Sequence, residues 1–157
     1  MSIYLINLTA LLSFHLLFYK YKNFRYENSI WIFIIFLLSI FIGFRDGIGG
    51  DWVEYETYYL KINASHQSNV SDLTFFQMIN ADLVYVFINK IAHYSKIGIF
   101  GVNFICAMFF MFALAIFLNN SQNKWLALAI SFPIIIVILG MGYTRQGLAF
   151  SFSLFLI

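Results

Sequence analysis

Long apolar runs are the feature of this chain that most constrains its fold. About 20 mostly apolar residues, at 1.5 Å each along a helix, cross the roughly 30 Å of hydrocarbon in a bilayer. Four runs meet or approach this length, at residues 3–19, 30–44, 97–118 and 125–142. A fifth run, residues 148–157, is too short to span, so we expect this chain to be the N-terminal part of a longer protein. The predicted fold class is all-α: a polytopic transmembrane helix bundle with four complete spans and a truncated fifth.

Composition supports an integral membrane protein and argues against other classes. Hydrophobic residues make up 62% of the 157 positions, with twenty Phe and one Pro, whereas soluble domains are nearer half apolar. The net charge of +2 comes with no long basic run, so nothing indicates nucleic-acid binding. Cys106 has no second cysteine with which to form a disulfide within the chain. Because no repeat or linker divides the sequence, we expect one membrane domain over residues 1–157.

The distribution of Lys and Arg predicts the orientation. Lys20, Lys22 and Arg25 gather in the short loop between the first two runs, whereas the long segment at residues 45–96 has few basic residues for its length. Short loops rich in Lys and Arg stay on the cytoplasmic side. The N-terminus and the segment 45–96 are therefore predicted outside, and the loop at residues 119–124 inside.

The long outer segment is predicted to contain a loop followed by an amphipathic helix. Residues 63–71 are polar and favour a loop. A helix at about residues 74–95 is indicated by apolar residues at spacings of three and four. These residues are Phe76, Ile79, Leu83, Phe87, Ile91 and Tyr94. Because Asp82 and Lys90 would be costly in hydrocarbon, we expect this helix to lie in the outer interface or against the bundle.

Charge is concentrated in one segment, GFRDGIGGDWVEY at residues 43–55, directly after the second apolar run. One interpretation is a solvated turn that merely ends a span. The other is a functional site, because Arg45 can make a forked contact with a phosphate. Asp46, Asp51 and Glu54 could act as general bases, bind sugar hydroxyls or hold a divalent cation. The sequence leaves these roles open.

Glycine and aromatic residues in the same segment favour the functional interpretation. Gly47, Gly49 and Gly50 would let backbone N–H groups approach an anion closely. Trp52 and Tyr55 provide flat amphipathic surfaces that suit a membrane interface or the stacking of sugar rings. The spacing matches no EF-hand loop, and GIGG is neither a Walker loop nor a dinucleotide fingerprint. No metal site is predicted.

A second polar cluster, YTRQ at residues 143–146, begins the last apolar run. A cation at a helix N-terminus opposes the macrodipole, so Arg145 is locally unfavourable there. It either snorkels to the lipid headgroups or, with the helix N-terminus, offers positive potential to a phosphate. Because Arg45 and Arg145 are both predicted at the outer level, we expect both to contact one anionic ligand.

These two clusters resemble the motifs of a known family. GFRDGIGGDWVEY resembles the G-F-R-x-x-x-G-x-D-[YW]-x-x-Y signature of EpsG-family membrane proteins, which are grouped with Wzy-type polysaccharide polymerases. YTRQGLAFSFSLF is similar to that family's R-Q-x-[LI]-A element, and Asp82 with Tyr85 is loosely similar to a third feature. The resemblance extends over most of the chain. Gly50 departs from it, standing where the family often has Thr.

The resemblance implies an enzyme of surface polysaccharide assembly, such as O-antigen, exopolysaccharide or capsule. Such a glycosyltransferase polymerises oligosaccharide repeat units carried on undecaprenyl pyrophosphate, at the outer face of the bacterial inner membrane. Arg45 and Arg145 would steady the departing pyrophosphate, and Asp51 or Asp46 would accept the proton of the attacking hydroxyl. The resemblance also implies that Gln146, Trp52 and Tyr55 bind the substrate. No cofactor is implied, and the expected partners are the lipid-linked oligosaccharide, membrane lipid, a chain-length regulator and a flippase.

Two other functions stay open at this point: a carrier or flippase for a lipid-linked or anionic solute, and a noncatalytic partner in an assembly complex. Transporters place ionisable residues and broken helices near the bilayer midplane. His15 and Pro133 are the only such features within the predicted spans. The strongest polar clusters lie instead at the predicted outer ends, which favours chemistry at the membrane surface over passage through it.

Overall fold

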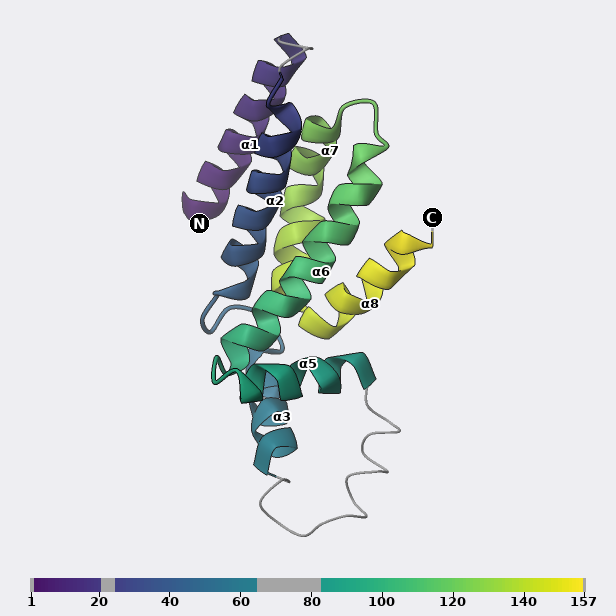
Figure 1. The fold of residues 1–157 in the computed structure, drawn as a ribbon. Coiled ribbons are helices and arrows are strands. Elements are labelled where there is room, and N and C mark those ends of the chain that lie inside the picture. Colours follow the sequence, from purple (N-terminus) through teal and green to yellow (C-terminus); the bar gives the residue numbers. More distant parts are fainter. Residues whose placement is uncertain (1, 21–24, 65–82, 157) are drawn as a thin grey trace.

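The computed structural model describes residues 2–20, 25–64 and 83–156, which fold into helices with no strand among them (Figure 1). In chain order the elements are α1 (Ser2–Lys20), α2 (Glu27–Gly43), α3 (Trp52–Ala64), α5 (Leu83–Tyr94), α6 (Ile99–Asn119), α7 (Lys124–Ser131), the π-helix η1 (Phe132–Met141) and α8 (Thr144–Phe155). The all-α fold class is confirmed.

The apolar helices form a bundle around α6. α1, α2, α6 and the continuous α7–η1 run alongside one another, and α8 packs on α6 at an angle to the others (Figure 1). α6 packs against α2, α5 and α8. Among the described residues, three segments are long and apolar enough to cross a membrane: Ile3–Lys20, Ile99–Asn119 and Lys124–Met141. α2 is equally apolar in character but shorter.

Close packing of α2 on α6 depends on a small residue. Gly43, the last residue of α2, lies so near α6 that a Cβ atom there would come within 2.5 Å of the Phe104 Cα. Small residues allow membrane helices to approach in this way. The approach fixes the end of α2, and with it the start of the charged segment.

Gly43→Ala should therefore destabilise the bundle by about 3 kcal/mol, because a methyl group would have to displace main chain rather than a flexible side chain. Gly142→Ala is the matched control, since Gly142 has helical dihedral angles and open space where its Cβ would lie. Thermal unfolding in detergent should show a lowered Tm for the first variant and an unchanged Tm for the second. Equal Tm values would contradict this account of the α2–α6 contact.

Polar contacts join α2 to α7 at one end of the bundle. The Lys124 Nζ lies 3.1 Å from the Glu27 carboxylate and donates to the Asn28 side-chain oxygen at 3.1 Å. The Trp125 ring nitrogen donates to Glu27 at 3.2 Å, and the Trp125 ring stacks on Phe18 with 4.7 Å between centroids. The end of α1, the start of α2 and the turn between α6 and α7 thus share one end of the bundle, and α3 and α5 occupy the other (Figure 1).

The fourth apolar run is not a uniform α-helix. Pro133 lies at the start of η1, where hydrogen bonding changes from α to π. Proline has no N–H to donate within an α-helix, so it favours such a change. η1 ends at Met141, and Tyr143 (φ −135°, ψ 77°) separates it from α8. The last run therefore begins as a helix at Thr144, before the predicted position 148.

The segment predicted as an outer loop, residues 45–96, contains a helix that sequence reasoning missed. α3 covers Trp52–Ala64, including the first positions of the predicted loop at 63–71, whose remaining part lies outside the described residues. α3 carries four aromatic residues among charged ones and has no clean apolar stripe, so its pattern resembled an interfacial loop. Its buried side is provided by Tyr55, with Tyr58 and Tyr59 partly buried.

The predicted amphipathic helix is found over Leu83–Tyr94, and its remaining predicted part, 74–82, lies outside the described residues. α5 packs on α3 and α6 through a face that includes Tyr85, Asn89 and Ala92. The apolar stripe expected from the spacing is instead exposed, with Phe87 64% and Leu83 71% accessible. The buried face combines Tyr85 and Asn89 with Val86, Ile88 and Ala92, so α5 has apolar residues on both its buried and its exposed sides.

Candidate functional site

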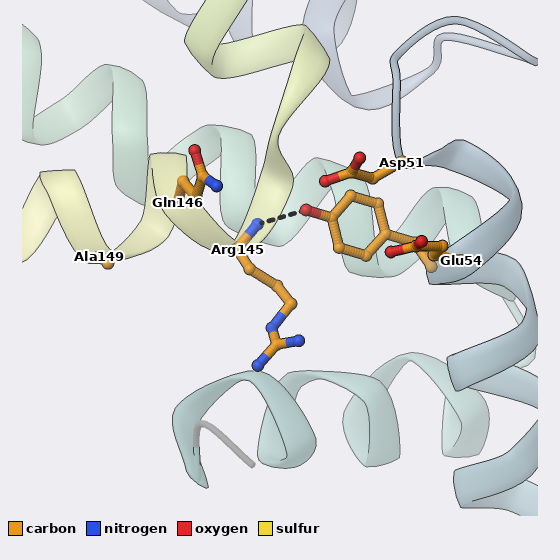
Figure 2. A pocket seen from close by; sticks show the side chains of 6 residues that line it. Asp51, Glu54, Arg145, Gln146 and Ala149 are labelled. Carbon is orange, nitrogen blue, oxygen red and sulfur yellow. Dashed lines mark hydrogen bonds between the residues drawn. The ribbon is translucent and has the colours of Figure 1, made fainter. Parts of the chain in front are cut away.

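An open pocket lies at the bundle end that carries α3 and α5. It forms where the start of α3 meets the start of α8 (Figure 2). Its lining residues are Asp51, Glu54, Tyr55, Arg145, Gln146 and Ala149. The two polar clusters, far apart in sequence, thus supply opposite walls of one pocket.

The local fold at the start of α3 places the two carboxylates. Gly49 has φ +124°, a backbone conformation suited to glycine, and its carbonyl accepts from the Trp52 N–H at 3.4 Å. The Asp51 carbonyl then accepts the Tyr55 N–H at 3.0 Å, which starts the helix. Acidic residues are stabilised at a helix N-terminus. Asp51 lies directly before α3 and Glu54 lies on its first turn, and both line the pocket.

Arg145 occupies the opposite wall beside a group of tyrosines. Its backbone N–H donates to the Tyr55 hydroxyl at 3.4 Å (Figure 2). Its guanidinium carbon lies 5.6 Å from the centre of the Tyr58 ring and 5.7 Å from that of Tyr85, within range for cation–π attraction. Figure 2 shows the side chain directed toward α5. The tyrosines thus hold a half-buried cation at the pocket.

Burial adjusts the titration of the aromatic groups in this region. The loss of hydration raises the pKa of the Tyr55 phenol, and its bond with the Arg145 backbone opposes that rise only in part. Burial likewise raises the pKa of Tyr85. A tyrosine is already neutral at physiological pH and these shifts only reinforce that state, so the Tyr55 hydroxyl has a proton that it can donate to a ligand.

Arg45 has a different environment from Arg145. It is only 5% exposed and points into the bundle. Its Nη1 donates to the Gly140 carbonyl at 3.0 Å and to the Ile42 carbonyl at 3.3 Å, and its Nη2 donates to the Thr144 hydroxyl at 2.6 Å. Burial lowers the pKa of the Arg45 guanidinium, but arginine keeps its charge in proteins. This charge is offset by carbonyl and hydroxyl dipoles.

The structure therefore brings some of the predicted site residues together and not others. Asp51, Tyr55, Arg145 and Gln146 line the pocket, as does Glu54. Three do not: Arg45 is buried, Asp46 is exposed, and Trp52 is half-buried with its ring 6.1 Å from that of Phe100. A shared anion between the two arginines stays a prediction. No cluster of metal-ligating side chains occurs in the described part of the chain.

Sequence reasoning missed the residues that surround the two arginines. Thr144 contacts Arg45, and its hydroxyl donates to the Asn103 side-chain oxygen at 3.3 Å. Asn103 is a buried amide in the apolar helix α6, and Tyr85 is a buried phenol on α5; a buried polar group needs a reason to be present. A polar residue within an apolar run can be recognised in the sequence. The residues that it contacts in the folded chain cannot.

A comparison with protein-family models gives a match to the EpsG family over residues 28–157. The chain belongs to the EpsG family. This family consists of membrane proteins like the Wzy-type polysaccharide polymerases. The match runs from the second residue of α2 through α8, so every residue that lines the pocket lies within it. No curated protein and no solved structure matches the chain.

Proposed function

We propose that this EpsG-family protein polymerises undecaprenyl-pyrophosphate-linked oligosaccharide repeat units by glycosyl transfer at the outer face of the bacterial inner membrane. The observation that carries this proposal is the pocket itself, which Asp51 and Glu54 line together with Arg145. Glycosyl transfer from a lipid pyrophosphate requires a group to receive a proton and a cation to stabilise the leaving anion. The pocket provides both kinds of group.

The proposed reaction uses the two walls of the pocket for different bonds. The acceptor hydroxyl oxygen attacks the anomeric carbon of the donor sugar, and the bond from that carbon to the pyrophosphate oxygen breaks. The hydroxyl proton passes to Asp51, and the bonding electrons leave with the lipid pyrophosphate. Arg145 stabilises the pyrophosphate charge, and the Tyr55 hydroxyl donates a hydrogen bond to it. Glu54 and Gln146 provide acceptors and donors for sugar hydroxyls.

The substrate reaches this pocket from the membrane. A lipid-linked oligosaccharide keeps its isoprenoid chain in the bilayer while its pyrophosphate and sugars lie at the surface. The pocket is suited to that arrangement, because it lies at the end of the bundle beside α5, whose exposed stripe is apolar. A flippase that delivers repeat units and a chain-length regulator are the partners that such a polymerase would require.

The proposal requires α3 to lie outside the cytoplasm, and cysteine labelling tests this. In a Cys106→Ala background, which removes the buried native thiol, Val53→Cys on α3 should react with an impermeant maleimide in intact cells. Val53 is 69% exposed, so access is not limited by burial. Ser121→Cys, at the opposite end, should react only after permeabilisation. The reverse pattern would place the pocket in the cytoplasm and rule out this function.

A further inference from the structure

We propose that Arg45 is a positioning residue, which fixes the break between η1 and α8 and thereby aims Arg145, without touching the substrate. This inference rests on the proposed function, in which Arg145 stabilises the leaving pyrophosphate. It assigns Arg45 a role different from the one its motif suggested, because the environment of the side chain is the interior of the bundle.

We call the contacts by which Arg45 joins the end of η1 to the start of α8 the Arg45 clamp. The first element of this clamp is the end of η1. The last carbonyls of a helix lack donors within the helix and need partners from elsewhere. Near the end of η1, the carbonyl of Leu139 accepts from the Tyr143 N–H at 3.2 Å. The next carbonyl, that of Gly140, accepts from the Arg45 Nη1 at 3.0 Å. A charged donor thus replaces the donor that a continuing helix would have supplied, and such bonds are stronger than neutral ones.

The second element is the start of α8. Thr144 is its first residue and directly precedes Arg145. The Arg45 Nη2 donates to the Thr144 hydroxyl at 2.6 Å, and that hydroxyl donates in turn to Asn103 on α6. One guanidinium therefore joins the end of η1 to the start of α8, across a break at which the backbone of Tyr143 has left the helical region. The direction in which Arg145 enters the pocket depends on this junction.

Glycines on both sides hold Arg45 in place. A Cβ atom at Gly49 would lie 2.7 Å from the Met141 carbonyl oxygen, so the loop after Arg45 presses on the end of η1. A Cβ atom at Gly43 would collide with α6. Three residues of the charged segment thus lie against neighbouring helices: Gly43, Arg45 and Gly49. The spacing between these residues in the sequence is explained by the packing of each one against a helix.

The position of Arg45 also separates it from the surface. It is 5% exposed, whereas Arg145 is partly exposed and lines the pocket. A ligand in the pocket would reach Arg45 only if the bonds to Gly140 and Thr144 were given up. Within the part of the chain that the structure describes, Arg45 forms no ion pair, so these dipolar contacts are what compensate its buried charge.

Two measurements on the full-length protein test the clamp. The first is hydrogen exchange of the peptide covering residues 139–148 in nanodiscs. Arg45→Ala should raise exchange there about tenfold, because the junction opens more often. Arg145→Ala should leave exchange at the junction unchanged. Thr144→Val should raise exchange, and Thr144→Ser should not, because serine keeps the hydroxyl. This second pair preserves the test if Arg45→Ala fails to fold.

The second measurement is the rate of chain elongation in producing cells, with levels of the protein matched. Arg45→Ala should slow elongation about 100-fold, since misplacement of a catalytic group by about 1 Å costs that much. In an Arg145→Lys background, which has lost the forked contact but keeps a charge, Arg45→Ala should add less than about twofold, because residues acting through one another are not additive. Thr144→Ser should restore most of the rate lost in Thr144→Val.

The outcomes separate this inference from the proposed function. If Arg45→Ala slowed elongation as much in the Arg145→Lys background as in the parent, the two arginines would act independently and the clamp would be refuted. Unchanged exchange at residues 139–148 in Arg45→Ala would refute it as well. Raised exchange in that variant, together with long chains persisting in Arg145→Ala, would support the clamp and overturn the proposed function.

Discussion

Arg145→Ala should reduce surface polysaccharide to single repeat units in cells that carry the full-length protein. The reason is that Arg145 is the cation lining the pocket, held beside the Tyr58 and Tyr85 rings. Removing one group that stabilises a leaving anion costs about 100- to 1,000-fold in rate. The chain-length distribution on a gel measures the effect directly. Arg145→Lys should give an intermediate length, because lysine keeps the charge but loses the planar fork.

Arg25→Ala is the matched control for this result. Arg25 is an exposed arginine just before α2 begins, and the start of α2 lies at the end of the bundle away from α3 and α5 (Figure 1), so its removal takes away the same charge elsewhere. Its variant should make chains of normal length at normal protein levels. Long chains in Arg145→Ala, with that variant present in the membrane at the parental amount, would mean that the pocket does not bind the leaving group.

The second large effect is expected at Asp51. Asp51→Asn should slow elongation about 100- to 10,000-fold, the range found when a general base is removed. Asparagine is nearly isosteric and keeps an oxygen at the start of α3, so the helix should persist. The measurement is the initial rate at which lipid-linked repeat units are consumed in isolated membranes, with the amount of enzyme held equal.

Asp46→Asn provides a control within the same loop. Asp46 carries the same group five positions earlier in the sequence, but it is exposed and lies outside the pocket. Its variant should retain the parental rate. If Asp46→Asn were the defective variant and Asp51→Asn the active one, the base would lie outside the pocket. If both were active, Glu54→Gln would be the remaining carboxylate variant to examine in this pocket.

Much of the fold was accessible from the sequence, because apolar runs determine helices in a membrane with little ambiguity. The bundle and the amphipathic character of α5 followed from run length and spacing. α3 did not, because its helix carries aromatic and charged residues on all sides and depends on contacts with α5 and α6. The sequence also did not predict which face of α5 is buried. Tyr85 and Asn89 are buried because α5 packs against α3 and α6.

The candidate site was likewise predicted only in part from the sequence. The sequence indicated which residue types matter, and Asp51, Tyr55, Arg145 and Gln146 do line one pocket. It gave no means of telling an arginine that faces a pocket from one that faces the interior. Arg45 and Arg145 look alike in sequence, each beside the end of an apolar run. The difference arises from the Gly140 carbonyl and the Thr144 hydroxyl, which lie about a hundred residues from Arg45.

The tyrosines around Arg145 come from α3 and α5, whereas Arg145 itself begins α8. During synthesis, the chain would complete every helix through η1 before the cation of the pocket exists. Until then Arg45 also lacks Thr144, one of the three groups that accept its hydrogen bonds. Insertion of α8 would therefore supply the cation and secure the buried arginine in a single late step, so an incompletely made chain in the membrane would carry no working site.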